Sequence, residues 1–305
     1  RLWATCYGGS DGEWPNSSVG NFGGGAVDID AGGNIVICGT TYSANFPVSP
    51  GAVKSSLSGQ LDAILIQLDA GGARNWATYY GGTANEGFSS VRTDASGNVF
   101  CYGDTKSPDF PATAGAFQPT FGGFWDQVLV KFSSGGSVLW STFIGGSGDE
   151  WAASMRVLPN GRVLLLGSTG SNNFPLTPDA IKNFLSSLQD YTITILSNAG
   201  QIVWSTYCPG YTNSWTDGDI ESDGNGNYIV ASGTNKYTGA LKTGIIRVLK
   251  VTPGSGIVWT REIEPQVPDN QVGGGRTRLA IDANGYLAVA SQTYVRKWNV
   301  PASGF

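Results

Sequence analysis

The sequence of 305 residues contains no histidine, and this absence excludes several classes of site. Without an imidazole the chain forms neither a Ser-His-Asp nor a Cys-His catalytic pair, and no histidine-ligated zinc or haem site. A histidine switch near neutral pH is excluded as well. The remaining candidates for binding or catalysis are carboxylates and aromatic rings.

Charged residues are also scarce, at 13% of the chain against about 25% in an average soluble domain. The net charge is −5, and no run of basic residues occurs anywhere in the sequence. The chain therefore lacks the positive surface that nucleic acid or an anionic membrane attracts. No apolar stretch approaches the roughly 18 residues of a membrane span, so we expect no membrane insertion.

The four cysteines follow neither a repeating position nor a metal-ligand spacing. Cys38 and Cys101 lie in equivalent predicted strands of neighbouring units, but stacked sheets roughly 10 Å apart hold Cα atoms too far apart for a disulfide. We therefore expect four buried free thiols, at Cys6, Cys38, Cys101 and Cys208. No metal and no cofactor is predicted.

Glycine and tryptophan, by contrast, are abundant, with 45 glycines and 10 tryptophans, and the tryptophans mark an internal repeat. The string WATCYGG at 3–9 returns as WATYYGG at 76–82, WSTFIGG at 140–146, WSTYCPG at 204–210 and, degraded, WTREIEP at 259–265. Three further segments recur in order between these strings. In the first unit they are AVDIDAGGN at 26–34, IVICGT at 35–40 and DAILIQL at 62–68.

Each segment is short, rich in β-branched and aromatic residues and bounded by Gly, Asn and Asp, which is typical of strands joined by hairpins. Four such strands repeated about every 60 residues predict the blades of a β-propeller. We therefore predict an all-β fold, a five-bladed β-propeller of four-stranded antiparallel blades forming one domain over residues 1–305. The predicted blades are 24–82, 88–146, 152–210, 217–265 and 275–300.

A second signature supports this organisation in the first three blades. It reads SANFPVSPGA at 43–52, SPDFPATAGA at 107–116 and SNNFPLTPDA at 171–180. Together with the tryptophan strings and the Asp-x-x-Gly-Asn turns, it closely resembles the bacterial SBBP β-propeller repeat over almost the whole chain. The resemblance implies a secreted or cell-surface protein, and it implies no single activity.

The two chain ends are in phase with the repeat. Residues 302–305 (ASGF) followed by 1–3 (RLW) align without a gap to SGGSVLW at 134–140. The predicted fifth blade lacks its outermost strand, and residues 1–9 are predicted to supply it and to close the ring within one molecule. The alternative is that this strand inserts into a neighbouring copy and gives a head-to-tail assembly.

Residues that recur in every blade are expected to be architectural. Asp62, Asp126 and Asp190 begin the third strand of three blades, and we expect each to accept hydrogen bonds from backbone amides. The stretch DIESDGNGN at 219–227 resembles a calcium loop, but Val230 stands where an EF-hand needs its bidentate Glu. We interpret this stretch as an ordinary hairpin turn.

The loops that lead from one blade into the next are predicted to surround the mouth of the central channel. They carry acid and aromatic residues in pairs, and carboxylates beside flat apolar rings are typical of a sugar-binding surface. The alternative is that these rings wedge between blades while the acids face water. The candidate ligand-binding residues are Glu13, Trp14, Glu86, Phe88, Glu150, Trp151 and Trp215.

The same loops supply the carboxylates that a glycosidase needs, namely Glu13, Glu86, Asp149, Glu150 and Asp217. Their similar surroundings do not separate an acid from a base, and the repeat resembles the SBBP pattern rather than a glycosidase pattern. We therefore predict no enzymatic activity and no catalytic residue.

The function that the sequence favours is a secreted, non-enzymatic binding or structural module of a bacterial cell-surface or extracellular assembly, such as a filament subunit. Its expected partner is a protein, either a second copy or a cell-surface protein, or a glycan. A lectin-like carbohydrate-binding propeller is the alternative, and a five-bladed propeller glycosidase is the third hypothesis. Asn16 is a glycosylation candidate, because N-S-S at 16–18 forms a sequon.

Overall fold

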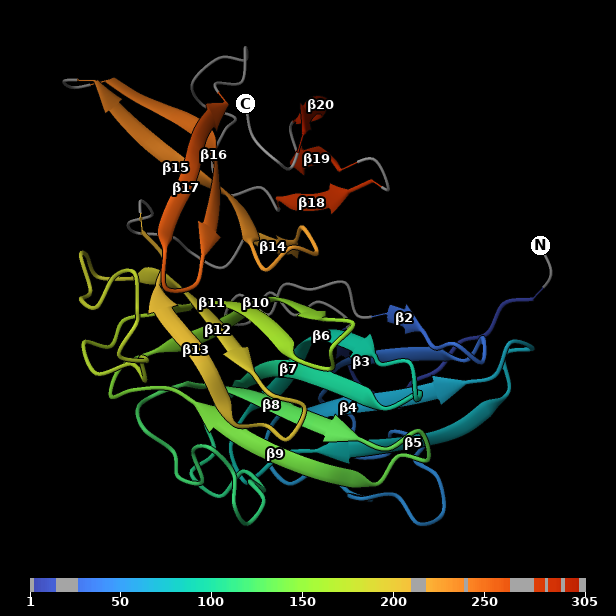
Figure 1. The fold of residues 1–305 in the computed structure, drawn as a ribbon. Coiled ribbons are helices and arrows are strands. Elements are labelled where there is room, and N and C mark those ends of the chain that lie inside the picture. The colour runs from blue at the N-terminus through green and yellow to red at the C-terminus, as the bar shows by residue number, and fades with distance from the viewer. Residues whose placement is uncertain are drawn as a thin grey trace.

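The computed structural model describes residues 3–14, 27–209, 218–238, 241–263, 277–282, 285–291 and 294–301 (Figure 1). These residues form β-strands joined by turns and loops. None of the described segments is a helix long and apolar enough to cross a membrane.

The strands form five antiparallel sheets, one for each predicted blade. Blade 1 contains β1 (Glu13–Trp14), β2 (Val27–Ile29), β3 (Ile35–Thr41), β4 (Asp62–Leu68) and β5 (Arg74–Tyr80). Blade 2 contains β6 (Glu86–Thr93), β7 (Val99–Thr105), β8 (Asp126–Phe132) and β9 (Val138–Ile144). Blade 3 contains β10 (Glu150–Val157), β11 (Val163–Thr169), β12 (Asp190–Leu196) and β13 (Ile202–Tyr207). Blade 4 contains β14 (Asp219–Ser222), β15 (Tyr228–Thr238), β16 (Leu241–Thr252) and β17 (Gly256–Ile263). Blade 5 contains β18 (Arg278–Ile281), β19 (Tyr286–Ser291) and β20 (Tyr294–Pro301).

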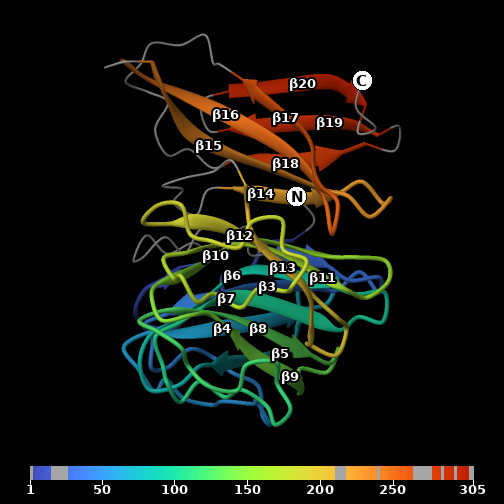
Figure 2. The same cartoon turned by 60° about the vertical axis from the view of Figure 1, so that its left-hand side comes forward.

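Within each blade the strands pair in chain order, as a series of hairpins. In blade 1 both β1 and β2 pair with β3, so they share the innermost position. Figures 1 and 2 show blades 4 and 5 lying above the group formed by blades 1 to 3. The innermost strands of successive blades, β2, β6, β10, β14 and β18, contact one another in that order.

The turns between strands are fixed by side chains that the repeat supplies. Asp30 accepts hydrogen bonds from the backbone amides of Gly32 and Asn34, both at 2.9 Å, and Asp94 makes the equivalent bonds one blade later. Asp223 does the same within 219–227, at 2.8 Å to the amide of Asn225. This stretch is therefore a hairpin turn, as its sequence indicates.

Most of the hydrophobic core lies between neighbouring blades, and one further cluster lies on blade 1 around Phe46 and Tyr79. One cluster joins Val36 and Leu65 of blade 1 to Val91 and Val130 of blade 2, and equivalent clusters occupy the next three junctions. The second and third strands of blades 2 and 3 are buried along their whole length. Burial on both faces explains their nearly continuous apolar sequences and the low charge of the chain.

Two tryptophans of the repeat connect blade 1 to blade 2 and blade 2 to blade 3. The Trp76 indole nitrogen donates to the carbonyl of Ser134 at 2.9 Å, and its ring lies on Gly136. Trp140 makes the same contacts one blade later, with Asn198 and Gly200. Gly136 has a φ of 85°, and a Cβ there would stand 2.8 Å from the indole, so both the backbone conformation and the ring require glycine.

The predicted closure of the ring by residues 1–9 is not observed. Residues 3–9 form no β-ladder with β20 in the described part of the chain. They lie against blade 1, where the Trp3 indole donates to the carbonyl of Ala70 at 2.9 Å and its ring covers Gly72. Trp3 thus makes with blade 1 the contact that Trp76 makes with blade 2, so residues 3–9 occupy the place of an outer strand.

All four cysteines are free thiols, and three of them are buried as predicted. The expectation of burial is wrong for Cys6, which is exposed. The equivalent residues Tyr79, Phe143 and Tyr207 are fully buried, because their strands pair with the third strand of a complete blade.

Candidate functional site

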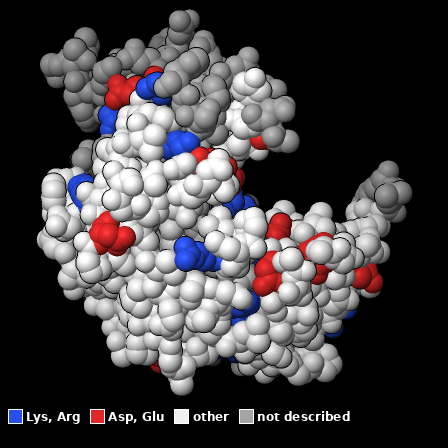
Figure 3. All heavy atoms as spheres, in the orientation of Figure 1, with Lys and Arg blue, Asp and Glu red and all other residues white. Residues whose placement is uncertain are grey.

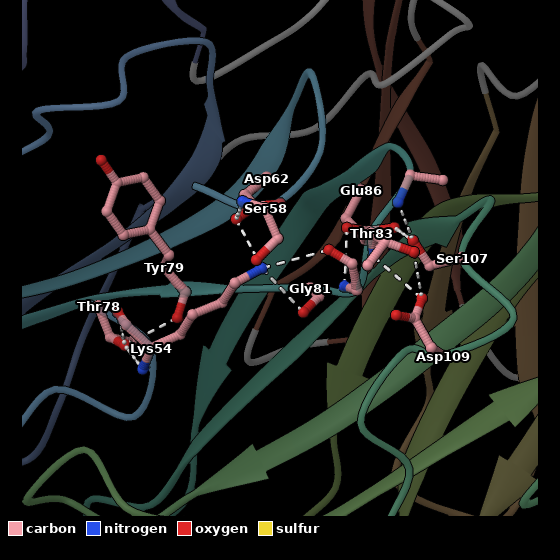
Figure 4. Close-up of polar contacts among 12 residues, drawn as sticks. Lys54, Ser58, Asp62, Thr78, Tyr79, Gly81, Thr83, Glu86, Ser107 and Asp109 are labelled. Carbon is pink, nitrogen blue, oxygen red and sulfur yellow. Dashed lines mark hydrogen bonds and ion pairs between the residues drawn. The ribbon is translucent and has the colours of Figure 1, made fainter. Parts of the chain in front are cut away.

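Glu86, a predicted ligand-binding residue, begins β6 and points into the protein (Figure 4). Its carboxylate accepts hydrogen bonds from the Gly82 amide at 3.0 Å, from the Thr105 hydroxyl at 2.9 Å and from the Ser107 hydroxyl. The side chain has no exposed surface. It therefore holds together the start of β6, the end of β7 and the loop that enters blade 2.

The same brace recurs in two other blades. Glu150 accepts hydrogen bonds from the Gly146 amide at 2.8 Å, the Thr169 hydroxyl at 2.5 Å and the Ser171 hydroxyl at 2.6 Å. Glu13 accepts them from the Gly9 amide at 2.9 Å and the Thr41 hydroxyl at 3.1 Å.

These positions correct the sequence-based site. Glu86 and Glu150 have no exposed carboxylate for a ligand at the surface, and Phe88 is buried against Tyr80 at a ring-centroid distance of 6.1 Å. The physical reason is that the loop entering each blade needs its amides and hydroxyls satisfied, and a buried carboxylate accepts several of them. The alternative interpretation, that the aromatic rings wedge between blades, describes Phe88 correctly.

The structure does not test the predicted roles of Trp14, Trp215 and Asn16. The backbone of Trp14, in β1, pairs with that of Thr40, in β3. The side chain of Trp14 lies outside the described residues, as do Asn16, Trp215 and Asp217.

The aspartates at the starts of the third strands behave as predicted. Asp62 accepts the Ser58 amide at 3.1 Å, Asp126 the Gly122 amide at 2.7 Å and Asp190 the Ser186 amide at 2.7 Å. Lysines pair with two of them: Lys54 with Asp62 and Lys182 with Asp190, each at 2.7 Å. In blade 2 the equivalent residue is Gln118, whose amide nitrogen lies 3.4 Å from Asp126.

The pKa is raised for several buried carboxyl groups, among them Glu86, Asp104, Asp126 and Glu150. Burial raises the pKa of Glu86 to about 7, although the hydroxyls of Ser107 and Thr105 act in the opposite direction. Burial also raises the pKa of Asp126 to about 7, and the nearby Glu150 adds to this effect. Perturbed carboxyl groups often mark active sites, but Glu86 and Asp126 are fully buried and braced to the backbone, so their role is structural.

Trp151 is a predicted site residue that reaches the surface, as the half-buried Glu13 also does, and it lies beside a second tryptophan. It lies on β10 and is half-buried. Its ring faces that of Trp125 at a centroid distance of 5.0 Å and an interplanar angle of 35°. Trp125 ends the long loop of blade 2, and the backbone holds it there because its carbonyl accepts the Glu150 amide at 2.9 Å.

Two further residues lie next to this pair of tryptophans, Phe124 in sequence and Lys106 in space. Phe124 is 70% exposed, and its amide donates to the carbonyl of Gly148 at 3.0 Å. The Lys106 ammonium lies 5.9 Å from the centre of the Trp125 ring. We call Lys106, Phe124, Trp125 and Trp151 the aromatic platform. Flat rings with a polar group at their edge can stack on the apolar face of a sugar and bond its hydroxyls.

The sequence reasoning included Trp151 but missed the rest of the platform. Trp125 has no aromatic counterpart in the other long loops, since Leu61 and Gln189 occupy the equivalent positions. This departure from the repeat at a loop end was the signal that could have identified it.

No protein-family model matches the chain, and no curated protein matches it. Among solved structures, the chain is similar to the GH93 α-L-arabinofuranosidase of Fusarium graminearum in complex with arabinobiose. The identity is 12% and the TM-score 0.51, over 90% of this chain and 80% of that one. The β-propeller domain of the Trilobed protease from Pyrococcus furiosus aligns at 8% identity with a TM-score of 0.41, over 90% of this chain and 69% of that one.

The first of these neighbours corrects the prediction that the chain is not an enzyme. It is a glycoside hydrolase built on the same kind of fold, and it contradicts an exclusion that rested on the absence of a glycosidase sequence pattern. At 12% identity no such pattern needs to persist. The likeness itself shows the fold alone: this chain is an all-β protein of four-stranded antiparallel blades with the architecture of a β-propeller.

Proposed function

We propose that this β-propeller binds carbohydrate on the aromatic platform. The observation that carries the proposal is the pair of half-buried tryptophans, Trp125 and Trp151, held at 5.0 Å by loops that hydrogen-bond to each other. Fixed rings lose little conformational entropy when a ligand stacks on them, which favours binding.

A glycoside hydrolase is the second candidate function, and the similarity to the GH93 arabinofuranosidase favours it. Of the acids that the sequence offered for catalysis, Glu86 and Glu150 are buried within braces, whereas Glu13 and Asp149 are half-buried. Hydrolysis would therefore have to use carboxylates other than Glu86 and Glu150.

The platform is tested by titrating the protein with arabinobiose and with oligosaccharides of arabinan, xylan and cellulose. Trp125→Ala and Trp151→Ala are each expected to weaken binding at least about tenfold, because each removes half of the stacking surface. Phe184→Ala is the matched control, since Phe184 is an exposed aromatic residue of another loop. Unchanged affinity in both tryptophan variants would contradict the platform, and release of monosaccharide during the titration would favour the hydrolase.

The resemblance to the bacterial SBBP repeat supports three further proposals: membership of that family, a secreted or cell-surface location, and a protein partner in an extracellular assembly. Each stays a prediction of the sequence.

Closure of the ring by the N-terminal segment belongs with these proposals. Residues 3–14 already make with blade 1 the contacts of an outer strand and its loop, and pairing with β20 would complete blade 5. Closure would also cover the apolar side chains of β2: Val27 is 55% and Ile29 63% exposed, while Val91, the counterpart of Val27 in blade 2, is fully buried.

Cys6 reports on this closure. The other three thiols are buried, so a maleimide reagent should distinguish them from Cys6 in the native protein. If residues 3–9 pair with β20, Cys6 is expected to react at least tenfold more slowly than a free cysteine, at every protein concentration. Full reactivity would contradict closure, and protection that grows with protein concentration would favour pairing between copies.

A further inference from the structure

One position on the innermost strands breaks the repeat by its charge. The strand registers place five residues at equivalent points around the ring axis, each opposite the second strand of its own blade. They are Asp28 on β2, Arg92 on β6, Arg156 on β10, Glu221 on β14 and Ala280 on β18. A position that the fold needs equally in every blade would carry similar residues, so this variation calls for a separate explanation.

The guanidinium of Arg156 forms hydrogen bonds only within the protein. Its Nε donates to Glu221 at 2.9 Å, and its Nη2 donates to both carboxylate oxygens of Asp219 at 3.1 Å. Its Nη1 donates to the hydroxyl of Ser154 at 3.1 Å and to the carbonyl of Met155 at 2.9 Å. All five N–H groups of this guanidinium therefore have acceptors.

Arg92 occupies the equivalent position one blade earlier, but it lacks these hydrogen-bond acceptors. Its Nη1 donates to the carbonyl of Val91 at 2.7 Å, which matches the bond from Arg156 to Met155. The next blade presents Ser154 and Arg156 to Arg92, at the positions from which Asp219 and Glu221 bind Arg156. Among the described residues no carboxylate contacts Arg92, which leaves four of its five N–H groups without an acceptor there.

The acid on the other side of Arg92 is already engaged. The carboxylate of Asp28 accepts the backbone amide of Thr93 at 2.7 Å and the Thr93 hydroxyl at 2.9 Å. Asp28 thus ties β2 to β6 and forms no ion pair with Arg92.

The electrostatic balance of the two arginines differs accordingly. Burial and the neighbouring Arg156 lower the pKa of Arg92, although Asp28, Asp219 and Glu221 act in the opposite direction. Burial also opposes the charge of Arg156, but Asp219 and Glu221 outweigh it and raise the pKa of that residue. A half-buried guanidinium beside a like charge is stabilised by any anion that approaches it.

We propose that Arg92 binds the carboxylate group of a small ligand near the propeller axis. The ligand would occupy the position equivalent to that of the Asp219 and Glu221 carboxylates, which bind Arg156 in the next blade. A carboxylate matches the planar guanidinium with two parallel hydrogen bonds. Figure 3 shows a hollow between the upper and lower parts of the molecule, with acidic and basic side chains along its edge. This site is separate from the aromatic platform, since Arg92 lies near the far end of the strand that begins at Glu86.

The test uses sodium acetate and sodium glucuronate as probes at low ionic strength, with sodium chloride and glucose as matched controls. Both carboxylates are expected to raise the melting temperature of the wild-type protein in proportion to the logarithm of their concentration once the site is saturated. Arg92→Gln is expected to weaken binding at least tenfold, and Arg92→Lys is expected to bind more weakly than wild type, because an ammonium cannot make the bidentate contact.

Arg261→Gln is the control for the loss of one positive charge, since Arg261 is exposed on β17. Equal affinity for acetate and glucuronate would assign the ligand as the carboxylate alone, whereas tighter binding of glucuronate would assign it as an acidic sugar. The proposal is overturned if neither carboxylate binds the wild-type protein, or if Arg92→Gln binds as tightly as Arg261→Gln. Because the tryptophans of the platform are untouched in these variants, failure here leaves the sugar titration unaffected.

Discussion

Replacing Glu150 with alanine is expected to lower the free energy of unfolding by about 3 to 5 kcal/mol. The substitution leaves three buried donors without their acceptor: the Gly146 amide and the hydroxyls of Thr169 and Ser171. Each buried donor without a partner costs about 1 to 3 kcal/mol, and the hydroxyls recover part of this by rotating. Chemical denaturation monitored by tryptophan fluorescence measures the difference.

The control is Asp179→Ala, which removes an exposed carboxylate from the same blade and is expected to change stability by less than about 0.5 kcal/mol. The comparison also separates a structural from a catalytic role for Glu150. A catalytic acid would lose turnover while stability stayed the same, so a stable Glu150→Ala variant would contradict the brace.

Raising the pH from 5 to 8 is expected to destabilise the protein, and Gln118→Lys is expected to reduce that loss. Asp126 has a pKa of about 7 in the folded protein and about 4 in an unfolded chain. The folded state therefore retains a proton that the unfolded state releases, and this contribution is fully present below pH 4. It is lost as the pH rises through 7, and Glu86 adds a loss of the same sign over the same range.

A lysine at position 118 would place next to Asp126 the cation that Lys54 and Lys182 provide in blades 1 and 3. It would favour the ionised carboxylate, lower the pKa of Asp126 and flatten the dependence of stability on pH. Melting temperatures at pH 5 and pH 8 measure the slope, at about 2 °C for each kcal/mol in a domain of this size. Gln201→Lys, at an exposed site, makes the same charge change away from Asp126. Equal slopes in the wild type and both variants would refute the assignment.

Much of the fold could be predicted from the sequence because the repeat constrains it several times over. The tryptophan strings, the Asp-Gly turns and the aspartates at 62, 126 and 190 each recur, and each proved to be a hairpin, a blade-to-blade contact or a backbone acceptor. The same logic would have explained the glutamates. Glu86 and Glu150 recur together with the Thr-x-Ser pairs at 105–107 and 169–171, which provide their hydroxyl partners.

The candidate sites were harder to predict because they depend on contacts between residues far apart in the chain. Trp125 and Trp151 meet only after the long loop of blade 2 folds back on the start of blade 3. Arg92 and Arg156 look alike in sequence, and only the side chains that the next blade presents distinguish one from the other. Such differences follow from which blades are neighbours, and a linear repeat does not reveal them.

The fastening of Trp76 on Gly136 and of Trp140 on Gly200 has a consequence for how such a protein can evolve. The second unit carries both an indole for the unit after it and a glycine hairpin for the unit before it. A duplicate of this unit, inserted in phase, would therefore bring both halves of the contact. The number of blades can then change by duplication or loss of a whole unit without new contacts between blades. Selection would act mainly on the few positions at the axis and the rim where the copies already differ.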